Sequence, residues 1–222
     1  MAPLSTPDKW PSADMFDGTI NVEVGTKRKK PFTLHRGVLG FYSGYFEAAA
    51  MKDNFKEGTL GLIELPTEDV ATFEMFVRWL YTRKLPEPPA TGDNFKNLID
   101  LWLFADRREC PLLANQLLDA VRDETVRNWQ LSTTQLQNVY DNTAESAGLR
   151  RFIIFLFGQV GGSGFLSENH RQDWPAAAVW DLAKDLWKLK EEKAPIMSKA
   201  DLAKLSTCAY HTHETGVECP KK

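Results

Sequence analysis

The sequence predicts an α+β fold, with a small sheet of three to four strands and clustered helices, followed by an all-helical C-terminal extension. Short apolar runs that alternate at period two occur only before Pro66. From Thr67 onward, apolar residues recur every three to four positions, as they do in amphipathic helices. Few strands and many helices are typical of helices clustered on a small sheet rather than of an alternating parallel fold.

The first two strands are expected to form a hairpin around a basic turn at residues 25–31. Their alternating apolar positions are Ile20, Val22, Val24, Phe32 and Leu34. The basic run at 27–30 has two interpretations. Charges at a hairpin tip keep it soluble, whereas the same run also resembles a nuclear-localisation or phosphate-binding patch.

The following segments predict two small helices over 38–49, a short strand over 60–65 and a helix over 67–81 capped by Thr67. The inward stripe of the last helix would hold Val70, Phe73, Val77 and Leu80. A further helix capped by Asp93 would bury Leu98, Leu101, Trp102 and Ala105. Pro111 suits the first turn of the next helix, which would turn Leu113, Leu117, Ala120 and Val121 inward.

The chain looks entirely helical from about Val126. An apolar helix over 149–160 is interrupted by the glycine-rich segment 161–164, a flexible link by composition. Trp174 and Pro175 open another helix, whose inward face is predicted to hold Val179, Leu182, Leu186 and Leu189. Ser198 begins a last short helix, with Asp201 three residues on as in a capping box.

These observations divide the chain into four parts. Residues 1–16 form an extended N-terminal arm in which Trp10, Met15 and Phe16 pack against the body. The main domain is expected over 17–125, the helical extension over 126–205 and a polar tail over 206–222.

Composition excludes several classes of function. The net charge is −3, so the chain has no global field that attracts nucleic acid or an anionic membrane. The apolar runs are too short to span a bilayer, and the start of the chain lacks the pattern of a signal peptide. Three widely spaced cysteines do not make a disulfide framework. We therefore expect a cytoplasmic or nuclear protein.

The sequence contains no motif of a known enzyme class: there is no phosphate-binding loop, nucleophile elbow, metalloprotease motif or dinucleotide fingerprint. His35 has no nearby nucleophile or carboxylate in sequence with which to form a catalytic pair. We expect its imidazole to bond a backbone group at a strand-to-helix corner. No enzymatic activity and no catalytic residue are predicted.

The C-terminal tail offers one candidate metal site. Cys208, His211, His213 and Cys219 have the ligand chemistry of tetrahedral zinc, although their spacing matches no standard zinc finger. The alternative is a disordered tail in which these residues coincide by chance. No other cofactor is predicted.

Several motifs together resemble the BTB/POZ domain, a protein–protein interaction fold. The similarity covers about 16–125 and begins with Asp17 before the first strand. It continues through Phe32-Thr-Leu-His35, the helix residue Leu39 and a Ser-x-x-Phe motif at Ser43 and Phe46. Further matching segments follow in family order: Ile63-Glu-Leu-Pro66, Phe73-Glu-Met-Phe76, Trp79-Leu-Tyr81-Thr and Leu103-Phe-Ala105-Asp106. A weaker similarity over 139–151 resembles the helical extension of stand-alone BTB proteins of filamentous fungi.

The resemblance implies binding rather than catalysis. Many BTB proteins self-associate, and many dock on the cullin scaffold of ubiquitin ligases. Cullin-binding members often carry a hydrophobic-x-Glu motif before the third strand, and Phe55-Lys-Glu57 stands at that place. Tyr45 and Met51 lie on the helix before it and complete the implied partner-binding set. The alternative is that Phe55 packs inward and Glu57 is solvated.

Two departures from the family pattern limit what the resemblance implies. Residues 1–16 are too short and too rich in proline for the helix and strand of the usual N-terminally swapped dimer. We therefore expect a monomer, or a homo-oligomer formed through another contact. No kelch repeat, MATH domain or zinc-finger array follows, so substrate recruitment by an adaptor would fall to the region after Val126. The competing interpretation is a BTB scaffold without a cullin, acting in the nucleus.

Overall fold

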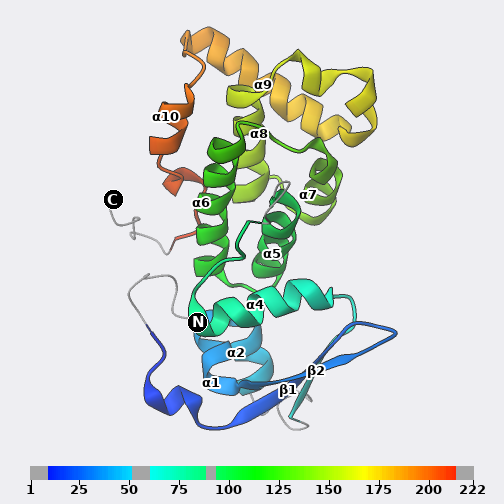
Figure 1. Ribbon diagram of the computed structural model, residues 1–222, viewed down its shortest axis with the longest axis vertical. Coiled ribbons are helices and arrows are strands. Elements are labelled where there is room, and N and C mark those ends of the chain that lie inside the picture. The colour runs from blue at the N-terminus through cyan, green and yellow to red at the C-terminus, as the bar shows by residue number, and fades with distance from the viewer. Residues whose placement is uncertain (1–9, 52–60, 89–93, 214–222) are drawn as a thin grey trace. The chain divides into compact units, whose positions relative to one another are not determined.

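The computed structural model describes residues 10–51, 61–88 and 94–213 (Figure 1). Contacts within the chain define two compact units. The first comprises Met1–Pro86, Phe104–Ala114 and His213–Lys222, and the second comprises Glu87–Leu103 and Asn115–Thr212. None of the described helices is both long enough and apolar enough to cross a membrane.

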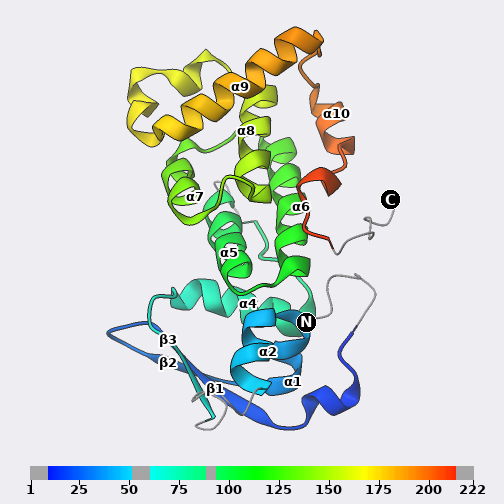
Figure 2. The same cartoon turned by 180° about the vertical axis from the view of Figure 1, so that it is seen from behind.

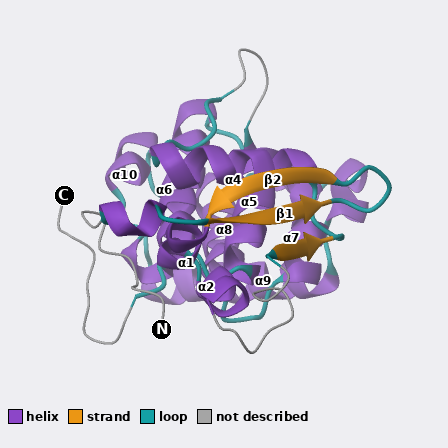
Figure 3. Cartoon of the chain, turned by 90° about the horizontal axis from the view of Figure 1, so that it is seen from below, coloured by secondary structure: helices purple, strands orange, loops and turns teal. Residues whose placement is uncertain are grey.

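A three-stranded sheet forms one side of the first unit, in the order β2-β1-β3 (Figure 3). The predicted hairpin is confirmed, because β1 (Thr19–Val24) pairs antiparallel with β2 (Lys30–His35). β3 (Leu62–Leu65) pairs parallel with the other edge of β1. The alternation is confirmed as well: Ile20, Val22 and Val24 are fully buried. In the basic run, Lys29 pairs with Glu23 and Glu64, and Lys30 pairs with Glu74.

Three helices lie on one side of this sheet: α1 (Arg36–Tyr42), α2 (Gly44–Met51) and α4 (Val70–Thr82) (Figure 2). Aromatic side chains fill the core of the unit. The Phe76 ring lies 4.9 Å from that of Phe104 and 5.8 Å from that of Phe46, measured between centroids. Such offset and tilted pairs add to the free energy gained from the buried area. The core therefore depends on aromatic contacts between helices.

The helix α4 begins three residues later than its sequence predicts. Asp69, rather than Thr67, is the N-cap, and its carboxylate accepts a hydrogen bond of 2.9 Å from the backbone N–H of Thr72. Phe76 and Trp79 are fully buried, together with the predicted Phe73 and Leu80. The predicted Val70 and Val77 are only half-buried. The bulkier aromatic rings fill the interior, and the two valines are left at its margin.

The N-terminal arm contacts α1, but it is not fully extended, and the predicted packing of its three large side chains is wrong in part: Met15 is half-buried, whereas Trp10 and Phe16 are 60% and 43% exposed. A 3-10 turn, η1 (Ala13–Phe16), brings the Met15 carbonyl so close to Gly37 that a Cβ at that glycine would collide with it. The Phe16 ring meets the His35 ring edge-on at 5.2 Å. The Trp10 indole lies 5.4 Å from the guanidinium of Arg83.

Two further helices, α5 (Phe95–Arg107) and α6 (Pro111–Asn128), contribute residues to both units. The predicted start at Pro111 is confirmed. All four residues predicted on the buried face of α5 are buried, and so are Leu113, Leu117 and Val121 of α6. Ala120 is half-buried. In both helices the helical period identifies the buried face.

The second unit also contains α7 (Leu136–Asn142), α8 (Gly148–Val160), α9 (Ala176–Glu192) and α10 (Lys199–Lys204). The capping box of α10 is formed by Ser198 and Asp201, as predicted. Between α8 and α9 the glycine-rich segment is not a plain flexible link. It leads into the 3-10 turns η3 (Ser163–Leu166) and η4 (Glu168–Asp173). The Trp174 indole fixes this connection by donating a 2.7 Å hydrogen bond to the Phe165 carbonyl.

The predicted inward face of α9 is wrong in part. Leu182 is buried and Leu189 is half-buried, but Val179 and Leu186 remain 44% and 41% exposed. The buried strip instead runs through Ala178 and Leu182. Because α9 carries apolar residues on two sides, its period does not reveal which side packs on the rest of the unit.

Candidate partner-binding site

The start of α2 is held by the short segment that follows α5. The Ser43 hydroxyl accepts a 3.1 Å hydrogen bond from the Phe46 N–H and donates one of 2.5 Å to the Arg108 carbonyl. The Gly44 N–H donates to the Glu109 carbonyl at 3.1 Å. The serine of the Ser-x-x-Phe motif thus caps one helix and ties it to a second segment.

A charged cluster beside α2 fixes Tyr45. The Arg108 guanidinium lies 4.2 Å from the centre of the Tyr45 ring and donates a 2.8 Å hydrogen bond to Glu68. Arg107 donates to the other carboxylate oxygen of Glu68 at 2.9 Å. Glu68 is only 6% exposed, so both arginines hold a nearly buried charge. The half-buried Tyr45 ring is therefore a rigid element of this surface.

Of the four residues implied in partner binding, the structure describes Tyr45 in full. Met51 ends α2, and its side chain lies outside the described residues, as do Phe55 and Glu57. The role of these four residues stays a prediction.

Only some of the fold-defining positions lie in the core of the first unit. Leu39, Phe46 and Ala105 are fully buried, and Asp106 is exposed near the end of α5. Asp17 follows η1, and its N–H donates to the Asp14 carbonyl.

The expectation that the His35 imidazole bonds a backbone group is wrong. Its Nδ1 lies 3.1 Å from the Tyr81 hydroxyl, which also accepts the His35 N–H at 3.1 Å, because α4 brings a phenol to this corner.

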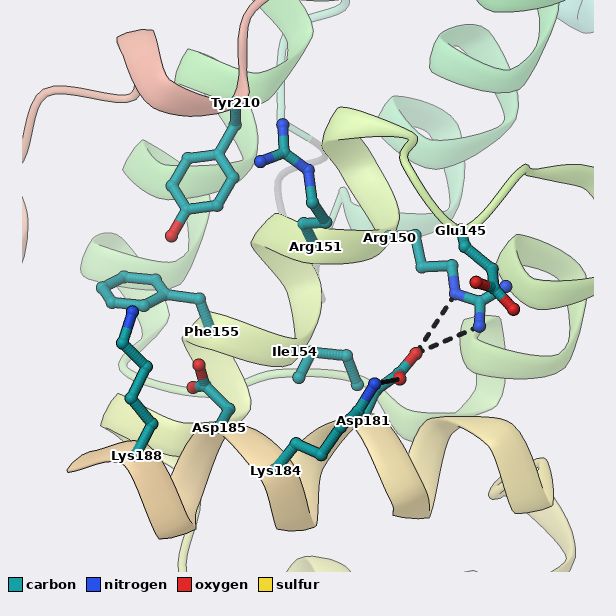
Figure 4. A pocket seen from close by; sticks show the side chains of 10 residues that line it. All are labelled: Glu145, Arg150, Arg151, Ile154, Phe155, Asp181, Lys184, Asp185, Lys188 and Tyr210. Carbon is teal, nitrogen blue, oxygen red and sulfur yellow. Dashed lines mark hydrogen bonds and ion pairs between the residues drawn. The ribbon is translucent and has the colours of Figure 1, made fainter. Parts of the chain in front are cut away.

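The second unit contains a pocket that the sequence does not predict. Its volume is about 500 Å³, and it is lined by α8, α9 and η5 (Cys208–Tyr210) together with Glu145 (Figure 4). The lining side chains are Glu145, Arg150, Arg151, Ile154, Phe155, Asp181, Lys184, Asp185, Lys188 and Tyr210. A volume of roughly 300–1,000 Å³ is typical of ligand pockets.

One wall of the pocket is organised by Asp181. Its carboxylate accepts hydrogen bonds from Arg150 at 3.0 and 3.3 Å and from the Tyr140 hydroxyl at 3.0 Å. Lys184 forms an ion pair with it at 2.8 Å. Burial opposes ionisation of this group, but the hydrogen bonds from Lys184, Arg150 and Tyr140 outweigh that effect and lower its pKa. Asp181 therefore carries its charge throughout the physiological range.

The neighbouring part of the lining, around Asp185 and Tyr210, has a different electrostatic character. Burial raises the pKa of Asp185, whose Oδ2 is buried without a hydrogen-bond partner. Burial also raises the pKa of Tyr210 to about 12, so this phenol stays neutral. Arg151 and Lys188 add positive charge to the lining (Figure 4). The pocket combines neutral hydrogen-bonding groups, aromatic rings and charges of both signs, a lining suited to the polar side chains of a peptide.

Residues 206–213 are not a loose tail. Thr207 hydrogen-bonds Asp119, and the Asn115 side chain bonds the Thr212 backbone in both directions at 2.9 and 3.0 Å. The Tyr210 ring packs 4.8 Å from that of Phe152. This correction to the disordered-tail alternative comes from contacts with α6 and α8, which polar composition does not reveal.

The candidate zinc ligands are only partly described. Cys208 belongs to η5, and the His211 Nε2 lies 3.1 Å from the Thr207 hydroxyl. Cys219 lies outside the described residues. In the part of the chain that the structure describes, no three His, Cys, Asp or Glu side chains gather as a metal site requires. Zinc binding stays a prediction that depends on residues beyond His213.

Comparison with known families agrees with this architecture. The family model for the BTB/POZ domain matches residues 10–123, a range that includes the arm as well as the sheet and its helices. A search for similar curated proteins returned no match. BTB/POZ domains generally mediate protein–protein binding and oligomerisation and are not generally enzymes. With more than half of its residues matched by that model, the chain belongs to the BTB/POZ domain family.

Proposed function

We propose that this protein is an adaptor that links a partner protein to a cullin-type ubiquitin ligase. The observation that carries the proposal is the position of Tyr45, held at the start of α2 by Arg108 and its pair with Glu68. A rigid aromatic ring with a polar edge is a suitable anchor for an interface because ordering it costs little entropy.

The connection between α2 and β3 supplies the second argument. It carries Phe55-Lys-Glu57, which resembles the hydrophobic-x-Glu motif of cullin-binding BTB proteins. In such a contact the phenylalanine would fill an apolar pocket of the scaffold, and the carboxylate would set the orientation. Tyr45 and Met51 would extend the same surface along α2.

Recruitment of the partner falls to the second unit. Its pocket has a size suited to one or two side chains of a bound peptide, and Arg151 and Lys188 add positive charge to its lining. The two functions then occupy different units of the chain, as an adaptor requires.

A cullin pull-down tests the proposal. Purified chain immobilised on beads is expected to capture a cullin N-terminal domain at micromolar concentration, and Phe55→Ala with Glu57→Ala should abolish capture. The matched control is Phe16→Ala with Glu74→Ala, which removes an exposed phenylalanine and an exposed glutamate of the same unit. If the unsubstituted chain captures no cullin, the adaptor function is wrong.

The second candidate is a scaffold that self-associates or binds partners without a cullin. The large exposed apolar residues of α9 favour it, because they lie in the second unit and outside the BTB match. Failure of the pull-down together with self-association of the chain would support this alternative.

A further inference from the structure

The pocket lined by α8 and α9 contains an arginine that is almost fully buried. Arg150 is 8% exposed, and its guanidinium carbon lies 4.0 Å from the centre of the Tyr140 ring. Its Nε and Nη2 both donate to one carboxylate oxygen of Asp181. These contacts hold the guanidinium in one orientation, so little entropy is lost when it also binds a ligand.

One nitrogen of this arginine is left for a ligand. Nη1 of Arg150 donates no hydrogen bond to any residue that the structure describes, and it is open to solvent. A guanidinium has five N–H donors, of which Nη1 carries two. Because Arg150 lines the pocket, an anion bound there can accept from donors that are already in position (Figure 4).

The charges beside Arg150 favour an anion over a cation. Arg150 and Lys184 share the single carboxylate of Asp181, so this part of the lining has one positive charge in excess. Arg151 and Lys188 contribute two more cations to the lining. An anion is attracted by this arrangement, and it does not have to compete with Asp181 for a lone partner.

The two other acidic side chains of the lining limit the charge that the ligand can carry. Glu145 is exposed, whereas Asp185 buries its Oδ2 against Gly158 of α8, out of reach of a ligand. Both carboxylates still repel an anion through space. Four basic and three acidic side chains give the lining a formal charge of +1. A carboxylate neutralises that charge, whereas a phosphate group, with about −1.5 to −2 at pH 7, exceeds it.

The uncharged side chains of the lining suit the remainder of an acidic residue. Ile154 and Phe155 offer apolar surface on which methylene groups can pack. Tyr210 remains a neutral phenol near pH 7, so its hydroxyl can donate to a carboxylate. The pocket thus provides donors for a charged end and apolar contacts for an aliphatic stem.

We propose that this pocket binds a carboxylate of a partner peptide, with Nη1 of Arg150 as the main donor. The proposal rests on the proposed function, because it names the group that the recruiting unit recognises. A glutamate side chain and a C-terminal carboxylate present the same chemistry, and the experiment below separates the two.

Peptide titrations of the full chain, followed by NMR of the Ile154 methyl groups, test the ligand class. The probes are four pentapeptides of glycine and serine that differ only at the centre or at the end. Three have blocked ends and carry glutamate, glutamine or phosphoserine at the centre, and the fourth carries glutamine and a free C-terminal carboxylate. At least one of the two carboxylate peptides is expected to bind with a dissociation constant of about 1 mM or lower. It should bind roughly tenfold more tightly than the blocked glutamine peptide.

The pattern of binding identifies the source of the carboxylate. Binding of the blocked glutamate peptide places it on a side chain, and binding of the peptide with the free end places it at a chain terminus. The proposal is overturned if neither carboxylate peptide binds, if the blocked glutamine peptide binds equally well, or if the phosphoserine peptide binds most tightly.

Substitutions in the lining test the donor. Arg150→Lys keeps a cation for Asp181 but removes Nη1, and it should weaken carboxylate binding roughly tenfold. Lys184→Gln removes an exposed cation of the lining and should weaken binding roughly threefold. The matched control is Lys190→Gln, an exposed lysine of the same helix that does not line the pocket.

Circular dichroism checks that each variant is folded, and Lys184→Gln decides the test if Arg150→Lys is not. Binding by the lining variants that equals binding by the Lys190→Gln control would overturn the proposal. The cullin pull-down keeps this result separate from the adaptor function. A chain that captures cullin but binds no carboxylate peptide overturns the pocket assignment alone, and one that binds the peptide but no cullin overturns the adaptor function alone.

Discussion

Asp181 and Asp185 lie one turn apart on α9, yet their environments shift their pKa values in opposite directions. Asp181 accepts hydrogen bonds from Arg150 and Tyr140, whereas Asp185 buries its Oδ2 beside Gly158 with no partner. A charge that is hydrogen-bonded stabilises the fold, and one that is desolvated without a partner opposes it. The two carboxyl groups therefore make opposite contributions to stability.

Substitution of Asp185 by Asn is expected to raise the free energy of unfolding at pH 7 by roughly 1 kcal/mol or less, because solvent still screens the half-exposed group. Burial raises the folded-state pKa of Asp185 above 3.8, so the ionised carboxylate opposes folding at neutral pH. The penalty disappears as the pH falls toward 3.8, where the folded protein takes up the proton. Urea denaturation followed by circular dichroism at pH 7 and pH 4 measures this gain. An equal gain in the free energy of unfolding at both pH values would contradict the claim that the ionised Asp185 carboxylate opposes folding.

Substitution of Asp181 by Asn is expected to have the opposite effect, a loss of about 3 kcal/mol. The Arg150 guanidinium, whose side chain is 10% exposed, would remain without its anion. Because the folded-state pKa of Asp181 lies below 3.8, its contribution is present above that pH and is lost as the pH falls through the folded pKa. In the same denaturation series, Asp181→Asn should therefore remain destabilised at pH 4, where Asp185→Asn comes close to the unsubstituted chain. A variant as stable as the unsubstituted chain at pH 7 would show that the ion pair is weak.

Glu68→Gln should destabilise the first unit by about 3 kcal/mol, because Arg107 and Arg108 would share a neutral amide in place of a buried carboxylate. The Arg108 guanidinium also loses part of the restraint that holds it over Tyr45. Guanidinium chloride denaturation measures the loss. Glu74→Gln is the control, since its ion pair with Lys30 is exposed and should contribute less than about 1 kcal/mol. Similar costs for both variants would contradict the special role of the buried cluster.

The parts of the fold that the sequence predicts are those fixed by local rules. The alternation of Ile20, Val22 and Val24, the proline at the start of α6 and the capping box at Ser198 each depend on neighbouring residues. These signals reflect strand and helix periods or helix ends, which the residues themselves determine. The sequence therefore predicts the elements and most of the core.

The missed features depend on contacts between distant residues. Glu68 meets arginines 39 and 40 positions away, and Asn115 meets Thr212 across 97 positions. Periodicity carries no information on such pairs. The α9 helix presents a different difficulty, since it has apolar residues on two sides and only packing selects which side is buried. The sequence does not predict the pocket either. In the sequence, Asp181 and Asp185 look like solvated positions of a surface helix.

Gly148→Ala should detach η5 from the second unit. A Cβ at position 148 would collide with the backbone carbonyl of Tyr210, which cannot move away as a flexible side chain would. We expect faster amide hydrogen exchange over 206–213 and a loss of stability of roughly 1–3 kcal/mol. Gly162→Ala is the control, because a methyl group added there would meet no atom of a non-adjacent residue within 4 Å. Unchanged protection of the amides of 206–213 would show that the close approach of Gly148 to the Tyr210 backbone is not needed to hold η5 in place.

The Cys110 thiol should resist alkylation in the folded chain. It is 1% exposed, and burial raises its pKa to about 12, so almost none of the reactive thiolate forms near pH 8. With Cys208 and Cys219 changed to Ser, labelling by a thiol reagent should proceed only when the segment after α5 opens. Ser43→Ala removes the hydroxyl that bonds the Arg108 carbonyl and caps α2, a cost of about 1 kcal/mol, and should speed labelling roughly fivefold. Rapid labelling of the chain that retains Ser43, or no acceleration in the variant, would contradict the coupling between α2 and this segment.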